Sequence, residues 1–422
     1  MKTCALNIAV WLCLLSLLTM FAPSLNAQAR PQSAYLQFPS DTAALYPFYQ
    51  RVAQWQNTGQ GRINVLHIGA SHVQAGVFSH RMRWHFSHLG DTAALPSRGL
   101  IFPFSAARTN NPPYYKVRSE GTWKTTRNVY KDYDIDLGMS GIAITTQDST
   151  ARVYVKLNKD SSLLYQFSRI RLLCNAPSPS FIPLVNDSLF GTYDRATQSW
   201  TFQLTQAQDS FSLSFVENKA VRAFMTNNLM AFSDKCSDYF QLNGMLLDND
   251  NPGISYHAIG VNGASVHDYI RCRHFQRDIQ LIKPDLVIFG IGINDATKPE
   301  FTQELFVHQY DTLINYLQAA NPHLTMIFMT NNDSYIRRKT PNKNALVAQA
   351  AFVELAEKHQ AALWDVFDMM GGLGSARRWR DKALMKPDLV HFTNAGYEYL
   401  GDCLFEAIMH DYQQYLKTKP HE

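Results

Sequence analysis

Short apolar segments that alternate with helical segments constrain the fold of this chain more than any other feature. The apolar segments have the length and residue types of buried strands, and they lie at Ile63–Ile68, Ile254–Ile259, Leu286–Phe289, Thr325–Met329 and Ala362–Val366. Helical patterns stand beside them, at Asp41–Gln56, His80–Leu89, Val266–Leu281, Phe301–Ala320, Lys343–Gln360 and Asn394–Leu416. This alternation predicts an α/β domain with a doubly wound, parallel, five-stranded sheet.

The alternation is interrupted between the first strand and the second. From about residue 101 to residue 250, strand-like runs are separated by turn residues, and these runs are Tyr114–Ser119, Gly141–Thr146, Arg152–Leu157, Ile170–Cys174, Trp200–Leu204, Phe211–Val216 and Phe240–Leu247. Such spacing is typical of a β-sandwich or a jelly roll. We therefore predict a discontinuous α/β domain, residues 28–100 and 251–422, with an inserted β-sandwich at residues 101–250.

Met1–Ala27 has the pattern of a secretory signal peptide. Lys2 precedes an apolar stretch, Ala5–Phe21, and small residues follow near the expected cleavage point. A membrane anchor is the alternative, but the Asn-Ala-Gln-Ala stretch fits cleavage better. No cysteine follows the apolar stretch, which argues against a lipoprotein anchor, and no later segment approaches the roughly 18 apolar residues of a membrane span. We expect an exported protein, periplasmic or extracellular, without a stable membrane span after cleavage.

Composition allows well-packed cores and argues against one class of partner. The 422 residues are 46% hydrophobic and 18% charged, as expected for globular domains. The formal net charge is +4 and the basic residues are scattered, so we expect no nucleic-acid partner. The cysteines that follow the signal match no metal-binding spacing. Export permits a disulfide between Cys174 and Cys236, which share the β-rich region; neither this pairing nor the oligomeric state is decided by the sequence.

Ser71 stands directly after the first strand, in the stretch Ile63–Gly76 (INVLHIGASHVQAG). A serine between a strand and a helix lies on a tight turn with an exposed hydroxyl, near helix N–H groups that favour negative charge. The alternative is an ordinary helix N-cap.

Three later stretches place further polar or glycine residues in comparable positions. Gly263 follows the second strand, where it can present an unobstructed N–H or simply shape a turn. Asn294 follows the third strand, as an amide donor or as a structural turn residue. Asp388 and His391 have the Asp-x-x-His spacing in which a carboxylate can orient an imidazole that takes a proton from serine; a surface ion pair is the alternative.

The carboxyl ends of parallel strands meet at one edge of a sheet, so these stretches come together. In this combination the chain resembles the SGNH (GDSL-like) hydrolase family, over Ile63–Val77 and Ile254–Gly401. The resemblance implies a flavodoxin-like sheet and a serine esterase without metal or cofactor. It also implies Ser71 as nucleophile and His391 as general base oriented by Asp388. An oxyanion hole would consist of the N–H of Ser71, the N–H of Gly263 and the amide of Asn294.

Three residues of the first block need separate mention. Ala70 stands where the family usually has aspartate, a supporting group rather than a member of the triad. His72 stands where many members have leucine, and it either lines the site or packs beside the nucleophile. His67 is expected to be a hydrogen-bonded histidine of the strand.

The inserted β-sandwich makes the chain similar to bacterial peptidoglycan O-acetylesterases, whose insert resembles a carbohydrate-binding module. This similarity implies an exported esterase that removes O-acetyl groups from a polysaccharide, most readily peptidoglycan, and some aromatic side chains of the insert could stack on sugar rings. The alternatives are an esterase for plant or host glycans or for lipids, an acyltransferase, and a non-catalytic glycan-binding protein.

Overall fold

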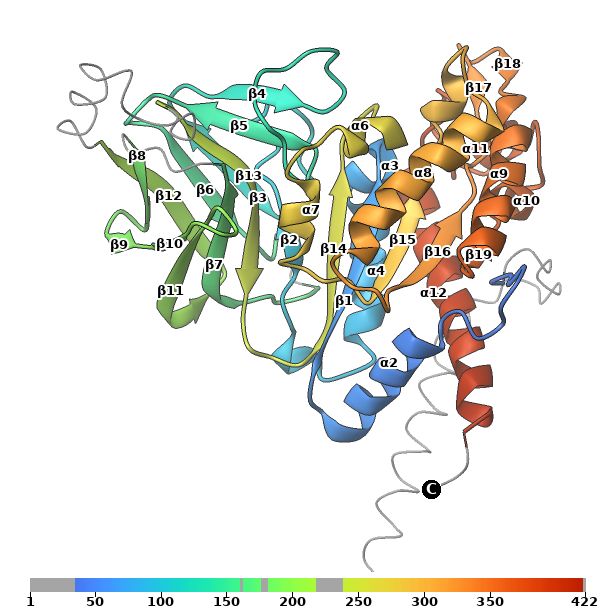
Figure 1. Ribbon diagram of the computed structural model, residues 1–422, viewed down its shortest axis with the longest axis horizontal. Coiled ribbons are helices and arrows are strands. Elements are labelled where there is room, and N and C mark those ends of the chain that lie inside the picture. Colours follow the sequence, from blue (N-terminus) through green and yellow to red (C-terminus); the bar gives the residue numbers. More distant parts are fainter. Residues whose placement is uncertain (1–34, 160–161, 176–180, 218–237, 420–422) are drawn as a thin grey trace, which may run out of the picture.

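The computed structural model describes residues 35–159, 162–175, 181–217 and 238–419. Met1–Ala27, the predicted signal peptide, and Cys236, the possible partner of Cys174, lie outside these residues. Two units are visible in Figure 1, a helix-covered sheet and a β-rich unit beside it. Within the described residues, no helix has the length and apolar composition needed to cross a membrane.

One sheet is parallel throughout and forms the centre of the α/β unit. Its strand order is β14-β1-β15-β16-β19, with bounds of Gly253–Gly260, Arg62–Gly69, Leu286–Gly290, Thr325–Met329 and Ala362–Trp364. In order along the chain this is 2-1-3-4-5, the flavodoxin-like doubly wound order. The predicted fold class is confirmed, and the order changes direction beside β1, where such sheets place their ligands.

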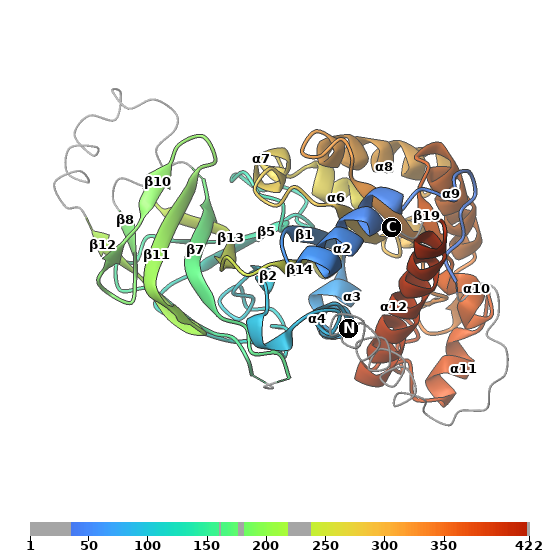
Figure 2. The ribbon, with the colours of Figure 1, turned by 90° about the horizontal axis from the view of Figure 1, so that it is seen from below.

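Helices cover both faces of this sheet, as Figure 2 shows. On one face lie α2 (Tyr46–Thr58), α4 (Val77–Ser87) and α12 (Asn394–Lys417), and on the other lie α6 (Val266–Ile270), α7 (Phe275–Ile279), α8 (Gln303–Gln318) and α9 (Asn344–Lys358). The short helices α3 (Ser71–Gln74), α10 (Val366–Met370) and α11 (Ala376–Asp381) complete the unit. Alternate side chains of β15 point to opposite faces of the sheet. Leu286 and Ile288 pack with α2, α4 and α12, whereas Val287 and Phe289 pack on the opposite side.

The β-rich unit consists of two packed antiparallel sheets. In the described residues their orders are β10-β11-β7-β13-β5-β4, with β2 also paired to β13, and β3-β6-β12-β8-β9. The strands are β2 (Gly99–Ile101), β3 (Lys116–Glu120), β4 (Lys124–Arg127), β5 (Ile142–Thr146), β6 (Arg152–Lys156), β7 (Phe167–Cys174), β8 (Phe181–Val185), β9 (Leu189–Phe190), β10 (Thr192–Asp194), β11 (Ser199–Gln208), β12 (Ser210–Glu217) and β13 (Phe240–Asp248). The rings of Phe167 and Phe211 meet between the sheets, 5.7 Å apart. This is a β-sandwich, and it is inserted between β1 and β14.

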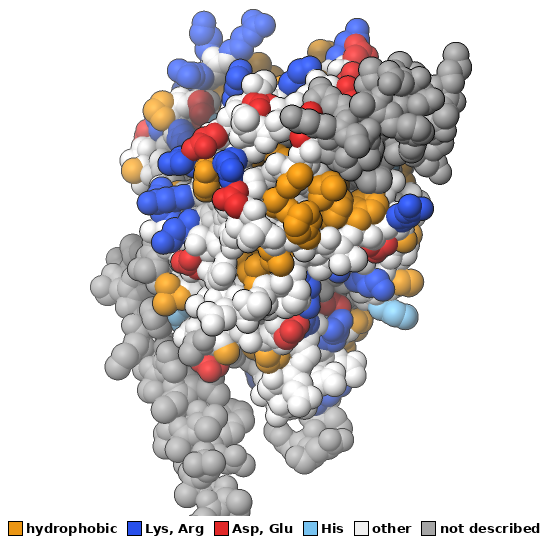
Figure 3. Space-filling model, turned by 90° about the vertical axis from the view of Figure 1, so that its left-hand side faces the viewer, with side chains coloured by type: hydrophobic (Ala, Val, Ile, Leu, Met, Phe, Trp, Pro, Cys, Tyr) orange, Lys and Arg blue, Asp and Glu red, His pale blue; other side chains and the backbone are white. Residues whose placement is uncertain are grey.

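The outward face of the sandwich is polar with apolar exceptions. Figure 3 looks at the molecule from the side of the sandwich and shows apolar side chains gathered near the centre, with Lys and Arg side chains toward one border. Phe190 and Val216 are among the exposed apolar residues of this unit.

The sandwich is tied to the α/β unit by shared packing and by charge. One buried cluster extends from Leu66 and Ile68 of β1 into the sandwich core. The Leu100 N–H donates to His257 Nδ1 at 3.1 Å, and the carboxylate of Asp248 binds Arg62 at 2.6 Å. Because the two units share a core, deletion of the whole insert would expose apolar surface of the α/β unit.

Two helical regions of the chain are each divided into two helices in the structure. The segment after Ser71 breaks at Gly76, which has a φ of +79° and caps α4, because a left-handed residue ends one helix and lets the next begin at a new angle. The segment Val266–Leu281 forms α6 and α7 with a turn between them. A further hairpin of β17 (Tyr335–Ile336) and β18 (Thr340–Pro341) was not evident from the strand pattern.

Candidate active site

Three glycines lie side by side where the central strands end. Gly69 of β1 is in register with Gly260 of β14 and with Gly290 of β15. A Cβ at Gly260 would lie 2.6 Å from the carbonyl oxygen of Ala70 and 2.7 Å from the backbone nitrogen of Gln74. Glycine is therefore required for the turn after β1 to pack against the turn after β14. Figure 1 shows α3 and α6 at this edge of the sheet.

Ser71 is the first residue of α3 and is partly exposed at this edge. Its Oγ lies 2.9 Å from His391 Nε2. The short helix begins directly after the buried Ala70, so the serine hydroxyl emerges from the sheet where a strand turns into a helix, as its sequence context predicts.

His391 is held by Asp388, three residues earlier. His391 Nδ1 lies 3.0 Å from Asp388 Oδ2, while Asp388 Oδ1 accepts the N–H groups of Val390 and His391, each at 2.9 Å. Burial acts to raise the pKa of Asp388, but these two N–H groups and the imidazole outweigh it and hold the pKa below its usual value. The carboxylate is thus ionised at neutral pH and directs the free electron pair of Nε2 toward Ser71.

The loop that carries this pair is anchored to the neighbouring segment after β16. The Tyr335 N–H donates to the Leu389 carbonyl at 3.1 Å, and Asn332 Nδ2 donates to the Val390 carbonyl at 3.1 Å. Leu389 has a φ of +57°, a left-handed conformation that costs an ordinary residue about 1 kcal/mol. These backbone contacts hold the tight turn that brings Asp388 and His391 together.

Gly263 and Asn294 lie on the two neighbouring loops. Gly263 has a φ of +86°, and a Cβ at this position would have its nearest neighbour in Val129, 4.0 Å away. Asn294 Nδ2 donates to the Ala264 carbonyl at 2.8 Å. This bond occupies one amide hydrogen and fixes the side chain, which leaves the second hydrogen of the same nitrogen available to another acceptor.

Gln74 links these loops, a role that its sequence context did not suggest. Its Oε1 accepts the N–H of Asn262 at 2.7 Å, and its Nε2 donates to Asn110 Oδ1 at 3.0 Å. Asn262 Nδ2 also donates to Asn110 Oδ1, at 2.6 Å. Gln74 is one turn of helix beyond Ser71, and this spacing is the only sequence signal that could have indicated a shared face. The insert thus contacts the loops that carry Ser71 and Gly263.

His72 packs beside the serine-histidine pair. Its Nδ1 lies 2.8 Å from the Tyr397 hydroxyl, and its ring centroid is 5.4 Å from that of His391. Burial, with a contribution from His391, lowers the pKa of His72 to about 3, so the ring is neutral. His67 is likewise buried and neutral, with its pKa lowered by burial to about 3 and its Nδ1 2.9 Å from the Tyr256 hydroxyl. His67 is thus hydrogen-bonded through Nδ1 as expected, whereas its buried Nε2 has no partner among the described residues.

Asp295 is a buried residue that connects two segments of the site. Its two carboxyl oxygens lie 3.2 and 3.3 Å from the N–H of Val266, the first residue of α6. Burial raises the pKa of Asp295 to about 7, although the Lys298 ammonium and the Val266 N–H act in the opposite direction. Asp295 therefore joins the loop of Asn294 to the segment that follows Gly263. Because its pKa is about 7, its carboxyl gains or loses a proton near neutral pH.

This raised pKa predicts a pH-dependent stability. The folded chain keeps the Asp295 proton up to about pH 7 whereas the unfolded chain releases it near 3.8, so stability falls as the pH rises through that interval. Asp295→Asn retains an acceptor for Val266 without the charge. Between about pH 5 and about pH 8 we expect the wild type to lose roughly 2 kcal/mol more unfolding free energy than the variant. Urea unfolding at the two pH values measures this, and parallel losses in both proteins would contradict it.

A comparison with known families finds a match over part of the chain. Residues 238–399 match the GDSL-like Lipase/Acylhydrolase family, and these residues include Gly263, Asn294, Asp388 and His391. This part of the chain is similar to the GDSL-like hydrolases. The enzyme class expected from the sequence, a carboxylic ester hydrolase, follows from this family and from the serine-histidine-aspartate line. A comparison with curated proteins finds no match.

A comparison with solved structures finds matches that cover different shares of the chain. A structure described as a peptidoglycan O-acetylesterase in action has a TM-score of 0.71 at 16% identity and covers 90% of this chain and 99% of that chain. The common fold therefore includes the sandwich as well as the α/β unit. A lipase/acylhydrolase from Enterococcus faecalis (21% identity, TM-score 0.31) covers 37% of this chain and 76% of its own. A GDSL-like lipase from Bacteroides thetaiotaomicron (16%, TM-score 0.29) covers 38% and 76%.

Proposed function

We propose that this protein is an exported serine esterase that removes O-acetyl groups from a polysaccharide, with peptidoglycan as the first substrate to test. The observation that carries the proposal is the hydrogen-bonded line from Ser71 through His391 to Asp388, at the sheet edge where the loops of Gly263 and Asn294 also end. The pattern of Met1–Ala27 supports export.

The first half of the reaction forms an acyl-enzyme. Ser71 Oγ attacks the acetyl carbonyl carbon while His391 Nε2 takes the hydroxyl proton, and Asp388 stabilises the imidazolium that results. The carbonyl oxygen becomes an oxyanion in the tetrahedral intermediate. Its collapse breaks the bond to the sugar oxygen, which leaves as a hydroxyl with the proton from His391.

The second half returns the enzyme to its starting state. Water loses a proton to His391 Nε2 and attacks the acetyl carbonyl, and Ser71 leaves with that proton as acetate is released. In both halves the N–H groups of Ser71 and Gly263 and the second amide hydrogen of Asn294 would receive the oxyanion. Donors of this kind lower the barrier when they point to where charge develops.

A polysaccharide suits this architecture better than a small free ester. The insert touches the catalytic loops through Asn110, Gln74 and Asn262, so a polymer that rests on the sandwich lies within reach of Ser71. The structure with the same two-part fold is described as a peptidoglycan O-acetylesterase, which makes acetylated peptidoglycan the substrate of choice.

Acetate release from two polymers tests the proposal. O-acetylated peptidoglycan and acetylated xylan are each incubated with the wild type and with Ser71→Ala, at matched acetyl content. We expect the wild type to release acetate from peptidoglycan faster than from xylan, and the variant to release none from either. Faster acetate release from xylan would instead indicate that plant glycans are the substrate. Activity on a small ester with none on either polymer would overturn the assignment of a polysaccharide substrate.

Asn294→Ala tests the oxyanion hole separately. Removal of one donor is expected to lower kcat on an activated acetyl ester by about 10²-fold to 10³-fold with little change in KM. Asn332→Ala, which removes an asparagine that contacts the His391 loop through the Val390 carbonyl, is the matched control and should lose less. A loss from Asn294→Ala that appears in KM alone would make Asn294 a substrate-binding residue.

A further inference from the structure

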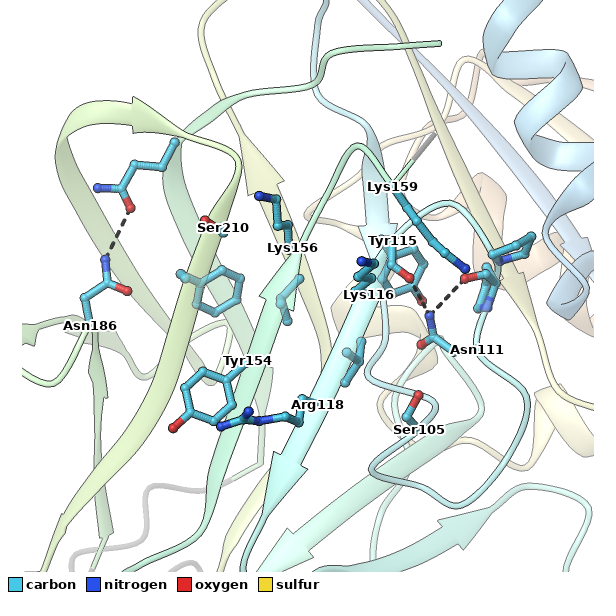
Figure 4. Close-up of a pocket in the computed structure, with 16 residues that line it drawn as sticks. Ser105, Asn111, Tyr115, Lys116, Arg118, Tyr154, Lys156, Lys159, Asn186 and Ser210 are labelled. Carbon is cyan, nitrogen blue, oxygen red and sulfur yellow. Dashed lines mark hydrogen bonds between the residues drawn. The ribbon is translucent and has the colours of Figure 1, made fainter. Parts of the chain in front are cut away.

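The outward face of the sandwich carries a groove of about 730 Å³ on strands β3, β6 and β12. It runs from the segment before β3 to the turn before β9 (Figure 4). The residues that supply its polar and charged lining are Ser105, Asn111, Lys116, Arg118, Tyr154, Lys156, Lys159, Asn186, Gln208 and Ser210. Four of them are cations, and no aspartate or glutamate is among the residues that line the groove.

Two of the lysines face each other across neighbouring strands. Lys116 of β3 and Lys156 of β6 are direct partners in the antiparallel register, and Figure 4 shows their side chains on the same side of the sheet. Like charges in such a pair destabilise a sheet. In the part of the chain that the structure describes, neither these two nor Lys159 forms an ion pair. Within the described residues, the positive charge of these lysines is therefore not paired with a carboxylate.

Arg118 and Tyr154 form the next cross-strand pair of the same face. The Arg118 guanidinium lies 4.7 Å from the centroid of the Tyr154 ring and donates to Glu120 at 2.6 Å. The Glu120 carboxylate therefore balances the positive charge of Arg118. Figure 4 shows the two side chains together at the lower end of the groove. The uncompensated charge is thus concentrated at the lysine end, and one flat aromatic surface lies beyond it.

The chemistry of this lining favours an acidic sugar polymer. The lysine ammonium groups can form ion pairs with carboxylates. Asn186, Gln208 and Ser210 offer hydrogen-bond donors and acceptors for sugar hydroxyls. Proteins that bind single-stranded nucleic acid typically combine positive charge with exposed aromatic rings that stack on the bases, whereas Tyr115 and Phe211 are buried here and Tyr154 is covered in part by Arg118. We propose that this groove binds a glycan chain that bears carboxylate groups.

The groove is adjacent to the catalytic loops along the chain. Asn111 and Pro112 line it, and they directly follow Asn110, which contacts Gln74 and Asn262. Pro112 also packs so closely on Gly76 that a Cβ there would lie 2.6 Å from the proline ring. An acidic glycan held by the lysines can therefore continue toward Ser71. The inference rests on the proposed function and identifies the charge class of the polymer that the esterase acts on.

Binding is measured with the Ser71→Ala protein, so that no ester is cleaved during the experiment. The probes are polygalacturonate and the same polymer with its carboxylates methyl-esterified, which share one sugar backbone while only the first carries negative charge. We expect polygalacturonate to bind, its affinity to fall with added salt because exposed charges are screened, and the esterified polymer to bind at least about tenfold more weakly. Equal affinity for the two polymers would overturn the proposal.

Charge variants locate the binding to the groove. Lys116→Gln with Lys156→Gln should weaken polygalacturonate binding by about tenfold or more, whereas Lys124→Gln with Lys131→Gln, the same charge change at exposed positions of the insert outside the groove, should not. The groove variant should melt no lower than its parent, because a repulsive pair is removed. In the Ser71-containing protein it should leave small-ester hydrolysis unchanged.

Further outcomes separate this inference from the proposed function. If the groove variant bound polygalacturonate as tightly as the control pair, the groove would not be the binding site. If the protein bound single-stranded DNA more tightly than polygalacturonate, the ligand would be a nucleic acid and not a glycan. If the wild type released no acetate from any polymer but the groove variant still lost polygalacturonate binding, the proposed esterase function would fail while the acidic-glycan site stood.

Discussion

Ser71→Ala is expected to remove hydrolysis of an activated acetyl ester, with kcat lowered by a factor on the order of 10⁵ to 10⁶. The reason is that the serine oxygen forms the covalent bond to the acyl group, and no other hydroxyl shares its position 2.9 Å from His391 Nε2 within the described residues. The side chain is partly exposed, so its truncation should leave the melting temperature nearly unchanged.

A serine-directed phosphonate gives this prediction a second readout. The wild type should gain the mass of one phosphonyl group on the peptide that contains Ser71, and Ser71→Ala should gain none. Ser87→Ala is the matched control, because the partners of the Ser87 hydroxyl among the described residues belong to its own helix end and include the Trp84 carbonyl at 2.8 Å. Retention of most turnover by Ser71→Ala would refute the whole mechanism.

His391→Ala is expected to cost almost as much as the loss of Ser71, and Asp388→Asn about 10⁴-fold in kcat. The second effect follows from the hydrogen bonds. An asparagine at 388 can still accept the N–H groups of Val390 and His391 through its oxygen, but its amide would donate to His391 Nδ1. The ring would then carry its proton on Nε2 and could not accept the proton of Ser71.

His72 is the control that shows which imidazole acts as the base. Its ring is only 5.4 Å from that of His391, but its Nδ1 is engaged by Tyr397 and burial lowers its pKa to about 3. We expect His72→Ala to lower kcat far less than His391→Ala. Steady-state kinetics on a small acetyl ester compare the three variants, and an Asp388→Asn protein as active as the wild type would show that the carboxylate does not orient the base.

The insert has a closer relation to the catalytic edge than a separate binding module would have. Asn110 accepts hydrogen bonds from both Gln74 and Asn262, and the buried cluster of β1 continues into the sandwich. Replacement of the insert by a short linker would therefore disturb the loops of Ser71 and Gly263 together. Point variants on the outward face, such as those at Lys116 and Lys156, separate polymer binding from catalysis where deletion cannot.

Several features could be predicted from local patterns because the physics behind them is local. The apolar run before Ser71 predicts a buried strand, the glycine after it predicts a tight turn, and the spacing of Asp388 and His391 allows contact within one turn of chain. Parallel strands in an alternating α/β chain have their carboxyl ends at one edge. The order β14-β1-β15-β16-β19 and the glycine row of Gly69, Gly260 and Gly290 agree with that reasoning.

Other features depended on contacts between residues far apart in the sequence. The bond of Gln74 to Asn262 spans 188 positions, and the bond of His72 to Tyr397 spans 325; no periodicity encodes either. The lysine pair of the groove exists only because β3 and β6 align Lys116 with Lys156, and a register one residue different would have turned one of these side chains to the sandwich core. Thus the sequence by itself determined the strands, the turn at Ser71 and the residue types at the sheet edge, because these follow from short-range patterns. Only the tertiary structure decided which loops are tied together and where the positive charge gathers, because lateral strand pairing and packing set both.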